Sequence, residues 1–275
     1  MKGSQLFCLI CLSFVTTART AQADVVTRYT LETGMEYYSG NYGTSQHTDI
    51  VYIPVTGKVQ GNNWSAKWTI PYIKITGTNS VVNQLGQTAT GASGNPSVRS
   101  GMGDWLLAAT RNVHNGGTNG FVVNLTGKVK LATADTAKGL GTGVNDYAIE
   151  STLFKPSPDI THFATLGYKI YGSSATYPLH NTIYGSLGSS YKFAQGTNAG
   201  AMLIASQKVM ENKSNRAEIL LFVSHTLGKQ WKTQGYVLKG FTNSVPDWGG
   251  GILVDYQFEM KRNPASFAML GAFDA

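Results

Sequence analysis

Hydrophobic and polar residues alternate one by one along most of the chain. At the start of this pattern, Tyr29, Leu31 and Met35 alternate with Glu32 and Glu36. A period of two is that of a β-strand, whose successive side chains point to opposite faces. The pattern therefore predicts strands that have one apolar and one polar face.

The same alternation recurs often enough to predict about twelve strands and no convincing helix. In 199–210 and 230–242 neither face is clearly apolar, so the orientation of these two strands stays open. The expected strands are 28–37, 49–60, 62–77, 103–114, 120–131, 145–155, 161–171, 182–193, 199–210, 216–227, 230–242 and 249–259.

The connections between these strands alternate between short and long. Every second one is short and rich in turn residues, whereas the others are mostly longer, with 211–215 as the exception. Short periplasmic turns and long external loops are typical of an outer-membrane barrel. A soluble β-sandwich would also show alternating strands, but it gives no reason for sorted loops. The longer connections are 39–48, 77–100, 132–144, 172–181 and 243–249.

The apolar face carries aromatic residues near the strand ends, where outer-membrane barrels place their interfacial girdles. Only 13% of the residues are charged, and no run of eighteen apolar residues occurs, so any segments that cross lipid must be strands. We therefore predict an all-β, antiparallel transmembrane β-barrel with a single domain. The aromatic residues in question are Tyr37, Trp64, Tyr72, Trp231 and Phe258.

The N-terminus reads as a secretory signal peptide. Lys2 precedes an apolar run at 6–15, and the sequence at 21–23 is an A-x-A site, which predicts cleavage after Ala23 and export to the bacterial outer membrane. Both cysteines lie in this segment, so the mature chain has no thiol and no disulfide.

The mature chain carries a mild positive charge. Of the 22 basic residues, Lys2 and Arg19 leave with the signal, and 20 remain against 15 acidic ones. The excess is spread over the chain instead of forming a patch, so nucleic acid is not an expected partner.

Charged residues fall mostly on the polar face, which would line the lumen. The candidates are eight basic and seven acidic residues, a balance that favours internal ion pairs or a pore with weak charge selectivity. Tyr52 and Tyr184, if inward, would line a route for apolar solutes. The lumen-lining candidates are Arg28, Glu32, Glu36, Lys58, Lys67, Lys128, Lys130, Asp146, Glu150, Lys169, Lys192, Arg216, Glu218, Asp255 and Glu259.

The stretch GLGTGVNDYAIE at 139–150 suggests a phosphate-binding loop at first sight. Such a loop needs a helix after it, and the residues that follow alternate as a strand does. The glycines therefore suit a hairpin connection. A register centred near Lys138 places Lys130 opposite Asp146 as a cross-strand ion pair on the lumen wall.

Catalytic and metal chemistry find little support in the sequence. Ser224 and His225 are adjacent on a strand and point to opposite faces, so they cannot form a nucleophile and base pair. His47 and Asp49 offer two ligands for a metal, but no third is visible. We predict no catalytic residue, no cofactor-binding residue, no metal ligand and no cofactor.

Five blocks of sequence resemble, in order, those of a bacterial outer-membrane family known as putative transporters of the phenol degradation meta-pathway. The resemblance covers most of the mature chain and implies a signal peptide and a barrel of about twelve strands. It also implies passage of small, often aromatic or apolar, molecules. The chain has Ala132 where the family usually has Pro. The blocks are WTIPYIKITG (68–77), SGMGDWLLAAT (100–110), KVKLATAD (128–135), GLGTGVNDYAIE (139–150) and VPDWGGGILVDYQF (245–258).

Outer-membrane barrels commonly end on an aromatic residue, and Phe258 suits that role, yet the chain continues. The expected domains are the signal peptide 1–23, the barrel 24–260 and a C-terminal tail 261–275. The tail is a periplasmic extension, a plug, or a sign that the last strand is misplaced.

The expected function is passive passage of small hydrophobic or aromatic compounds through the outer membrane. Loops 77–100 and 132–144 have the length to fold over the mouth and act as a gate. Expected partners are outer-membrane lipid, the barrel assembly machinery and the solutes themselves. The alternatives are a barrel enzyme that acts on lipid or envelope substrates, and a closed structural barrel.

Overall fold

The described part of the computed structural model consists of strands and loops, without a helix. Among these residues no helix is long and apolar enough to cross a membrane. The structure describes residues 26–77, 80–83, 87–89, 97–117, 120–174 and 177–261. The strands are β1 (Val26–Gly40), β2 (Thr48–Gln60), β3 (Trp64–Gly77), β4 (Ser80–Asn83), β5 (Gln87–Ala89), β6 (Ser97–Met102), β7 (Trp105–Asn115), β8 (Val122–Leu131), β9 (Asp146–Pro156), β10 (Ile160–Ile170), β11 (Thr182–Ala194), β12 (Thr197–Ser206), β13 (Arg216–Leu227), β14 (Trp231–Gly240) and β15 (Trp248–Lys261).

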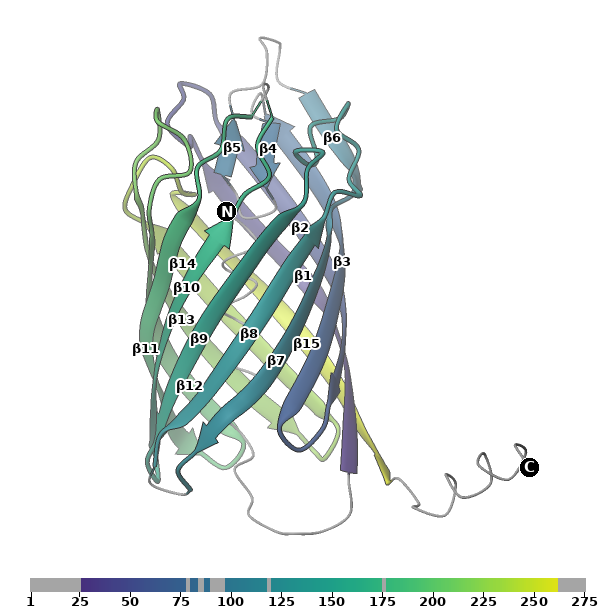
Figure 1. Cartoon of the computed structure of the whole chain (residues 1–275), viewed down its shortest axis with the longest axis vertical. Coiled ribbons are helices and arrows are strands. Elements are labelled where there is room, and N and C mark those ends of the chain that lie inside the picture. Colours follow the sequence, from purple (N-terminus) through teal and green to yellow (C-terminus); the bar gives the residue numbers. More distant parts are fainter. Residues whose placement is uncertain are drawn as a thin grey trace, which may run out of the picture.

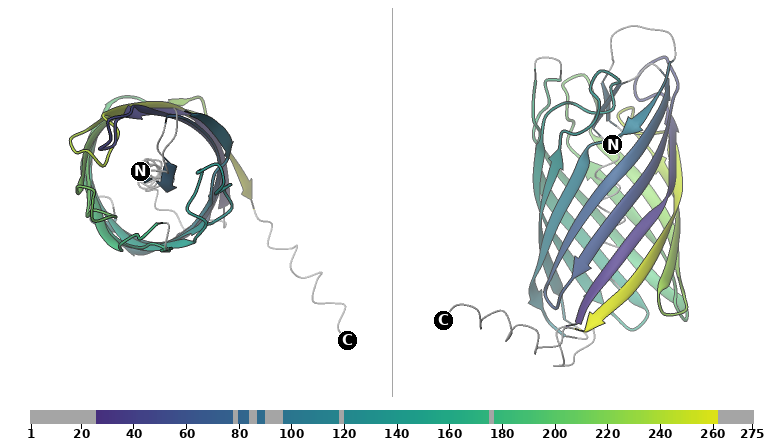
Figure 2. Two further views of the ribbon diagram at one scale, coloured as in Figure 1. Left: turned by 90° about the horizontal axis from the view of Figure 1, so that it is seen from above. Right: turned by 90° about the vertical axis from the view of Figure 1, so that its right-hand side faces the viewer.

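The main sheet closes on itself. Its thirteen strands pair antiparallel, mostly with the next strand of this sheet in the sequence, and β1 pairs with both β2 and β15. Figure 1 shows the tilted strands from the side, and the end-on view in Figure 2 shows the ring that they form. The predicted all-β antiparallel barrel is confirmed.

Strands β6 and β7 share one position in the barrel. Both pair with β3, which has Tyr72 opposite Met102 in β6 and Thr69 opposite Leu106 in β7. The thirteen strands thus occupy twelve positions, as the sequence predicted. The predicted strand 103–114 was placed too late, because pairing with β3 already starts at Ser97 and is interrupted only between Met102 and Leu106.

The alternation of the sequence becomes an outer and an inner face. In β13, Leu221 and Val223 are 49% and 48% exposed, whereas the neighbouring Leu220 and Phe222 are buried inside. Large apolar side chains are exposed on the outer faces of all the strands whose patterns were clear. An apolar outer surface around a closed barrel is what a lipid environment requires.

Aromatic pairs mark both ends of the barrel. Tyr29 stacks on Phe258 with 5.2 Å between ring centroids, and Tyr256 lies 4.8 Å from Trp231. These pairs lie at the end with the short turns. At the other end, Tyr37 contacts Trp248 at 5.2 Å. The two sets form girdles of the kind found at membrane interfaces.

Short turns lie at one end of the barrel and long loops at the other (Figure 1). We call these the short-turn end and the long-loop end. The one exception in the sequence prediction disappears, because β12 ends at Ser206 and the loop at 207–215 is long. Residues after Ser206 leave the barrel wall and bond to the loop at 171–181. The amide of His180 in that loop donates to the carbonyl of Val209 at 2.8 Å.

The longest loop is shorter than predicted. It was expected at 77–100, but β3 extends to Gly77 and β6 begins at Ser97. Between them, β4 and β5 form a small separate hairpin, which the sequence did not predict.

The chain ends fall mostly outside the described residues. This holds for the predicted signal peptide 1–23 and for the predicted tail 261–275, except Lys261. Lys261 is the last residue of β15 and pairs with Val26 of β1.

Candidate functional site

The fifteen lumen-lining candidates all lie on strand positions that alternate with the exposed apolar residues. They therefore face the interior of the barrel, and nine of them are buried, including Glu36 and Lys128. Most lie in groups that span two or more neighbouring strands. The inner face of the wall therefore carries charged side chains at these positions.

One group of ion pairs near the long-loop end connects four neighbouring positions of the barrel wall. Lys130 Nζ lies 3.2 Å from a carboxylate oxygen of Asp146 and 3.3 Å from one of Asp104. Lys169 Nζ approaches the same Asp146 carboxylate at 3.2 Å. The cross-strand pair that the sequence predicted between Lys130 and Asp146 is confirmed by the register of β8 and β9.

This charged group also fixes the loop at 132–145. Lys130 Nζ donates to Thr142 Oγ1 at 2.9 Å, and the amide of Ala134 donates to Asp104 at 2.9 Å. Gly141 passes so close that a Cβ there would lie 2.9 Å from the Asp104 carboxylate, while Leu140 is fully buried in the interior apolar cluster. The loop is therefore held against the inner wall instead of standing free in solvent.

The other long loops bond to one another. Lys213 Nζ donates to the carbonyl of Tyr42 at 2.7 Å, and Ser214 Oγ donates to Asn243 Oδ1 at 2.6 Å. Burial lowers the pKa of Lys213 and raises the pKa of the Tyr42 hydroxyl. These contacts connect the loops at 41–47, 207–215 and 241–247.

Three further ion pairs lie along the lumen wall. Lys128 Nζ contacts Glu150 at 2.5 Å, and the Tyr184 hydroxyl donates to the same carboxylate at 2.8 Å. Tyr184 thus faces inward. The other two pairs are Arg216 with Glu218 and, at 2.8 Å near the short-turn end, Arg28 with Glu259.

Four further candidates lie opposite one another on β1 and β15 and on β2 and β3. Glu32 lies directly opposite Asp255, and Lys58 lies directly opposite Lys67. Asp255 also has Lys232 as its neighbour on β14. Lys232 was missed in the sequence, because neither face of its strand was clearly apolar.

An acid and tyrosine group also lies inside the barrel. The hydroxyls of Tyr38 and Tyr236 both donate to the Glu36 carboxylate, the latter at 2.5 Å. Tyr52 is buried on the same wall, opposite Glu36 in the register. The roles of Tyr38 and Tyr236 were not predicted, because the expected strand 28–37 ended before Tyr38 and neither face of the strand 230–242 was clearly apolar.

Apolar side chains form a continuous part of the inner wall. Phe154, Phe163, Met202 and Phe222 belong to one cluster with the buried tyrosines. The register joins members of the cluster across neighbouring strands, with Phe154 opposite Phe163 and Met202 opposite Leu220. The interior thus offers both charged and apolar surface.

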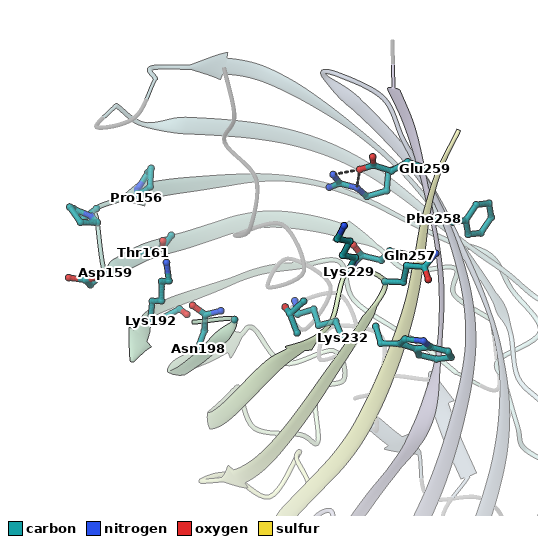
Figure 3. Close-up of a pocket in the computed structure, with 18 residues that line it drawn as sticks. Pro156, Asp159, Thr161, Lys192, Asn198, Lys229, Lys232, Gln257, Phe258 and Glu259 are labelled. Carbon is teal, nitrogen blue, oxygen red and sulfur yellow. Dashed lines mark hydrogen bonds and ion pairs between the residues drawn. The ribbon is translucent and has the colours of Figure 1, made fainter. Parts of the chain in front are cut away.

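A cavity of about 830 Å³ opens at the short-turn end (Figure 3). Ligand sites of small molecules span about 300–1,000 Å³, so the cavity is of suitable size. We call it the vestibule. A smaller cavity of about 160 Å³ lies beside it and is lined by Asn112, Asn124 and Phe154 among others. The vestibule is lined by Arg28, Pro156, Ser157, Pro158, Asp159, Thr161, Ser190, Lys192, Gly196, Asn198, Thr226, Lys229, Gln230, Trp231, Lys232, Gln257, Phe258 and Glu259.

The histidines considered for catalysis and metal binding are His225 and His47. Ser39 Oγ lies 2.8 Å from His47 Nε2 and donates to Asp49 at 2.7 Å. Ser224 is buried on the inner face, while His225 bonds to Thr197 at 2.7 Å on the outer face, as strand geometry predicted. His47 lies 3.2 Å from Asp49, and within the described ranges no group of three potential ligands surrounds a metal position.

The closed antiparallel barrel, its apolar outer belt, its aromatic girdles and its polar lumen together define the class: the fold is that of an outer-membrane β-barrel. Among solved structures, an outer-membrane channel from Pseudomonas putida F1 is similar, with a TM-score of 0.62 and 10% identity over 86% of this chain and 97% of that chain. The translocator domain of the autotransporter NalP from Neisseria meningitidis is similar at a TM-score of 0.51 and 14% identity, over 93% of this chain and 95% of that one. Identities this low establish a shared fold and nothing more. No protein-family model and no curated protein matches the chain.

Proposed function

We propose that the protein is a passive channel of the bacterial outer membrane. The observation that carries this proposal is the combination of an apolar outer belt with a charged inner wall around a closed ring of strands. The outer belt suits lipid, and the inner wall suits water and solute. In this orientation the short-turn end faces the periplasm and the long-loop end faces the exterior.

The proposed cargo is small and hydrophobic or aromatic. This is supported by the interior cluster that contains Phe154, Phe163, Phe222 and Tyr236. Aromatic rings pack well against other aromatic rings and against apolar side chains. The sequence resemblance to transporters of the phenol degradation meta-pathway points to the same class of solute.

The loop at 132–145 is the element that we propose restricts entry. It is fixed to the inner wall by Asp104 and Lys130 and buries Leu140 there. The gating role that the sequence suggested for the loop at 77–100 stays a prediction, because half of that loop lies outside the described part of the chain. We also propose that the signal peptide directs export and that the barrel assembly machinery inserts the protein into the lipid of the outer membrane.

The cargo can be tested by solute flux into liposomes that contain the refolded protein. We expect benzyl alcohol to enter faster than xylitol, relative to liposomes without protein, because only the aromatic solute matches the apolar part of the wall. Equal protein-dependent rates for the two solutes would contradict an aromatic preference and leave a general pore.

A further inference from the structure

The vestibule carries more positive than negative charge. Its lining contains four basic residues and only two acidic ones, Asp159 and Glu259. Glu259 is engaged by Arg28 at 2.8 Å. The remaining basic residues are Lys192, Lys229 and Lys232.

None of these three lysines forms an ion pair with a described carboxylate. Lys192 and Lys229 are exposed, whereas Lys232 is buried deeper in the wall. Asp255 faces Lys232 across β14 and β15 and offsets part of its charge, but it does not line the vestibule. Asp159 is exposed beside Lys192, whose amide donates to the Asp159 carbonyl at 2.7 Å, so the four basic and two acidic residues leave the lining with a net charge of +2.

Neutral hydrogen-bond donors lie between the lysines. Asn198 is opposite Lys192 in the register of β11 and β12, and Thr226 is opposite Lys232 in that of β13 and β14. Figure 3 shows Lys192 and Asn198 on one side of the vestibule and Lys229 and Lys232 across from them. Ammonium, amide and hydroxyl groups are all donors, and together they suit an anionic acceptor.

We propose that the vestibule is a binding site for small organic anions, and that the cargo of the channel includes aromatic carboxylates. The statement about the cargo rests on the proposed channel function, whereas the statement about the binding site does not. The ring of such a molecule suits the apolar lumen, while its carboxylate suits the lysines at the periplasmic exit. A cavity of about 830 Å³ holds a molecule of that size together with water.

The first test is the ion selectivity of the channel in a planar bilayer under a gradient of potassium chloride. A unit charge about 8 Å away in water, partly screened by salt, changes the local anion concentration about 1.7-fold, so three such charges change it about fivefold and two about threefold. We therefore expect chloride to be preferred, and we expect K192Q/K229Q/K232Q to lower the chloride to potassium permeability ratio about fivefold. An unchanged ratio would overturn the proposal.

Two further variants control this experiment. K192Q/K229Q changes only exposed lysines, so folding is preserved, and it should lower the ratio about threefold. K155Q removes a lysine at the same end but on the outer face, where Lys155 lies 4.6 Å from the centre of the Phe121 ring. It should leave the ratio unchanged, and an equal effect of K155Q would show that surface charge alone is responsible.

The second test does not require conduction. Binding of benzoate, with benzyl alcohol as the neutral comparison, is titrated with the full chain in detergent micelles. We expect benzoate binding that K192Q/K229Q weakens about threefold and K155Q does not. Benzoate binding without any conductance would support the anion site in the vestibule and contradict the channel function. Conductance without benzoate binding would support the channel function and contradict the anion site. Inorganic phosphate that binds as tightly as benzoate would contradict the organic part of the proposal.

Discussion

At the scale of single residues, the lumen charges form local groups across neighbouring strands. Asp146 is the most connected of them, because it contacts Lys130 and Lys169 and also accepts a hydrogen bond from the amide of Gly172 at 3.1 Å. If one charged side chain of a buried group is removed, the remaining charges stay buried without a partner. The loss of stability is then larger than the net contribution of the whole group. The stability of the long-loop end should therefore depend on this carboxylate.

Asp146→Asn should reduce the free energy of unfolding by about 2–4 kcal/mol. The measurement is urea unfolding in detergent, followed by tryptophan fluorescence and by gel mobility without heating. Asp135→Asn is the matched control, since Asp135 and its partner Lys138 are half exposed and 3.9 Å apart. The control should change stability by less than about 0.5 kcal/mol, and equal losses for the two variants would contradict a special role for Asp146.

The sequence predicted the partners of some of these residues but not of others. Lys130 and Asp146 could be paired because one loop joins their strands and fixes the register. Asp104 could not be linked to them, because it lies at the interruption between β6 and β7, which alternation does not reveal. Lys232 and Tyr236 belong to a strand whose inner face mixes apolar and polar residues, so periodicity did not identify that face.

At the scale of the strand, the outer face is defined by its contact with lipid. Leu221 and Leu227 lie on the same face of β13 and are both 49% exposed, but Leu227 is at the short-turn end and Leu221 is further along the strand. The cost of a charge on the lipid face falls from the midplane to the interface. The two positions therefore offer a matched pair that differs in depth.

Leu221→Arg should destabilise the inserted protein by about 2–4 kcal/mol, and Leu227→Arg by about 0–1 kcal/mol. Unfolding from lipid vesicles, followed by heat-modifiable gel mobility, gives both values. Similar effects at the two positions would argue against a bilayer around the barrel, because on a surface in water the cost of a charge does not depend on its position along the strand.

At this scale the sequence predicted the pairing order well and the ends of strands less well. Loop lengths identified the two ends of the barrel. The true end of β12 at Ser206 could not be predicted, because the following residues leave the wall to bond with the loop at 171–181, which lies far away in the chain.

At the scale of the whole molecule, the closed ring combines two surfaces of opposite character. The outer one is apolar and ends in aromatic girdles. The inner one carries charge, an apolar cluster and a vestibule of about 830 Å³ at the short-turn end. Such an arrangement suits a channel in which solutes meet the fixed loop at 132–145 first and the lysines last.

The most direct test is the single-channel conductance of residues 24–275, refolded and inserted into a planar lipid bilayer. A channel should give discrete, reproducible openings that occur in proportion to the amount of protein added. A protein that folds, as judged by heat-modifiable gel mobility, yet never conducts would contradict passage through the lumen and would favour a closed structural barrel.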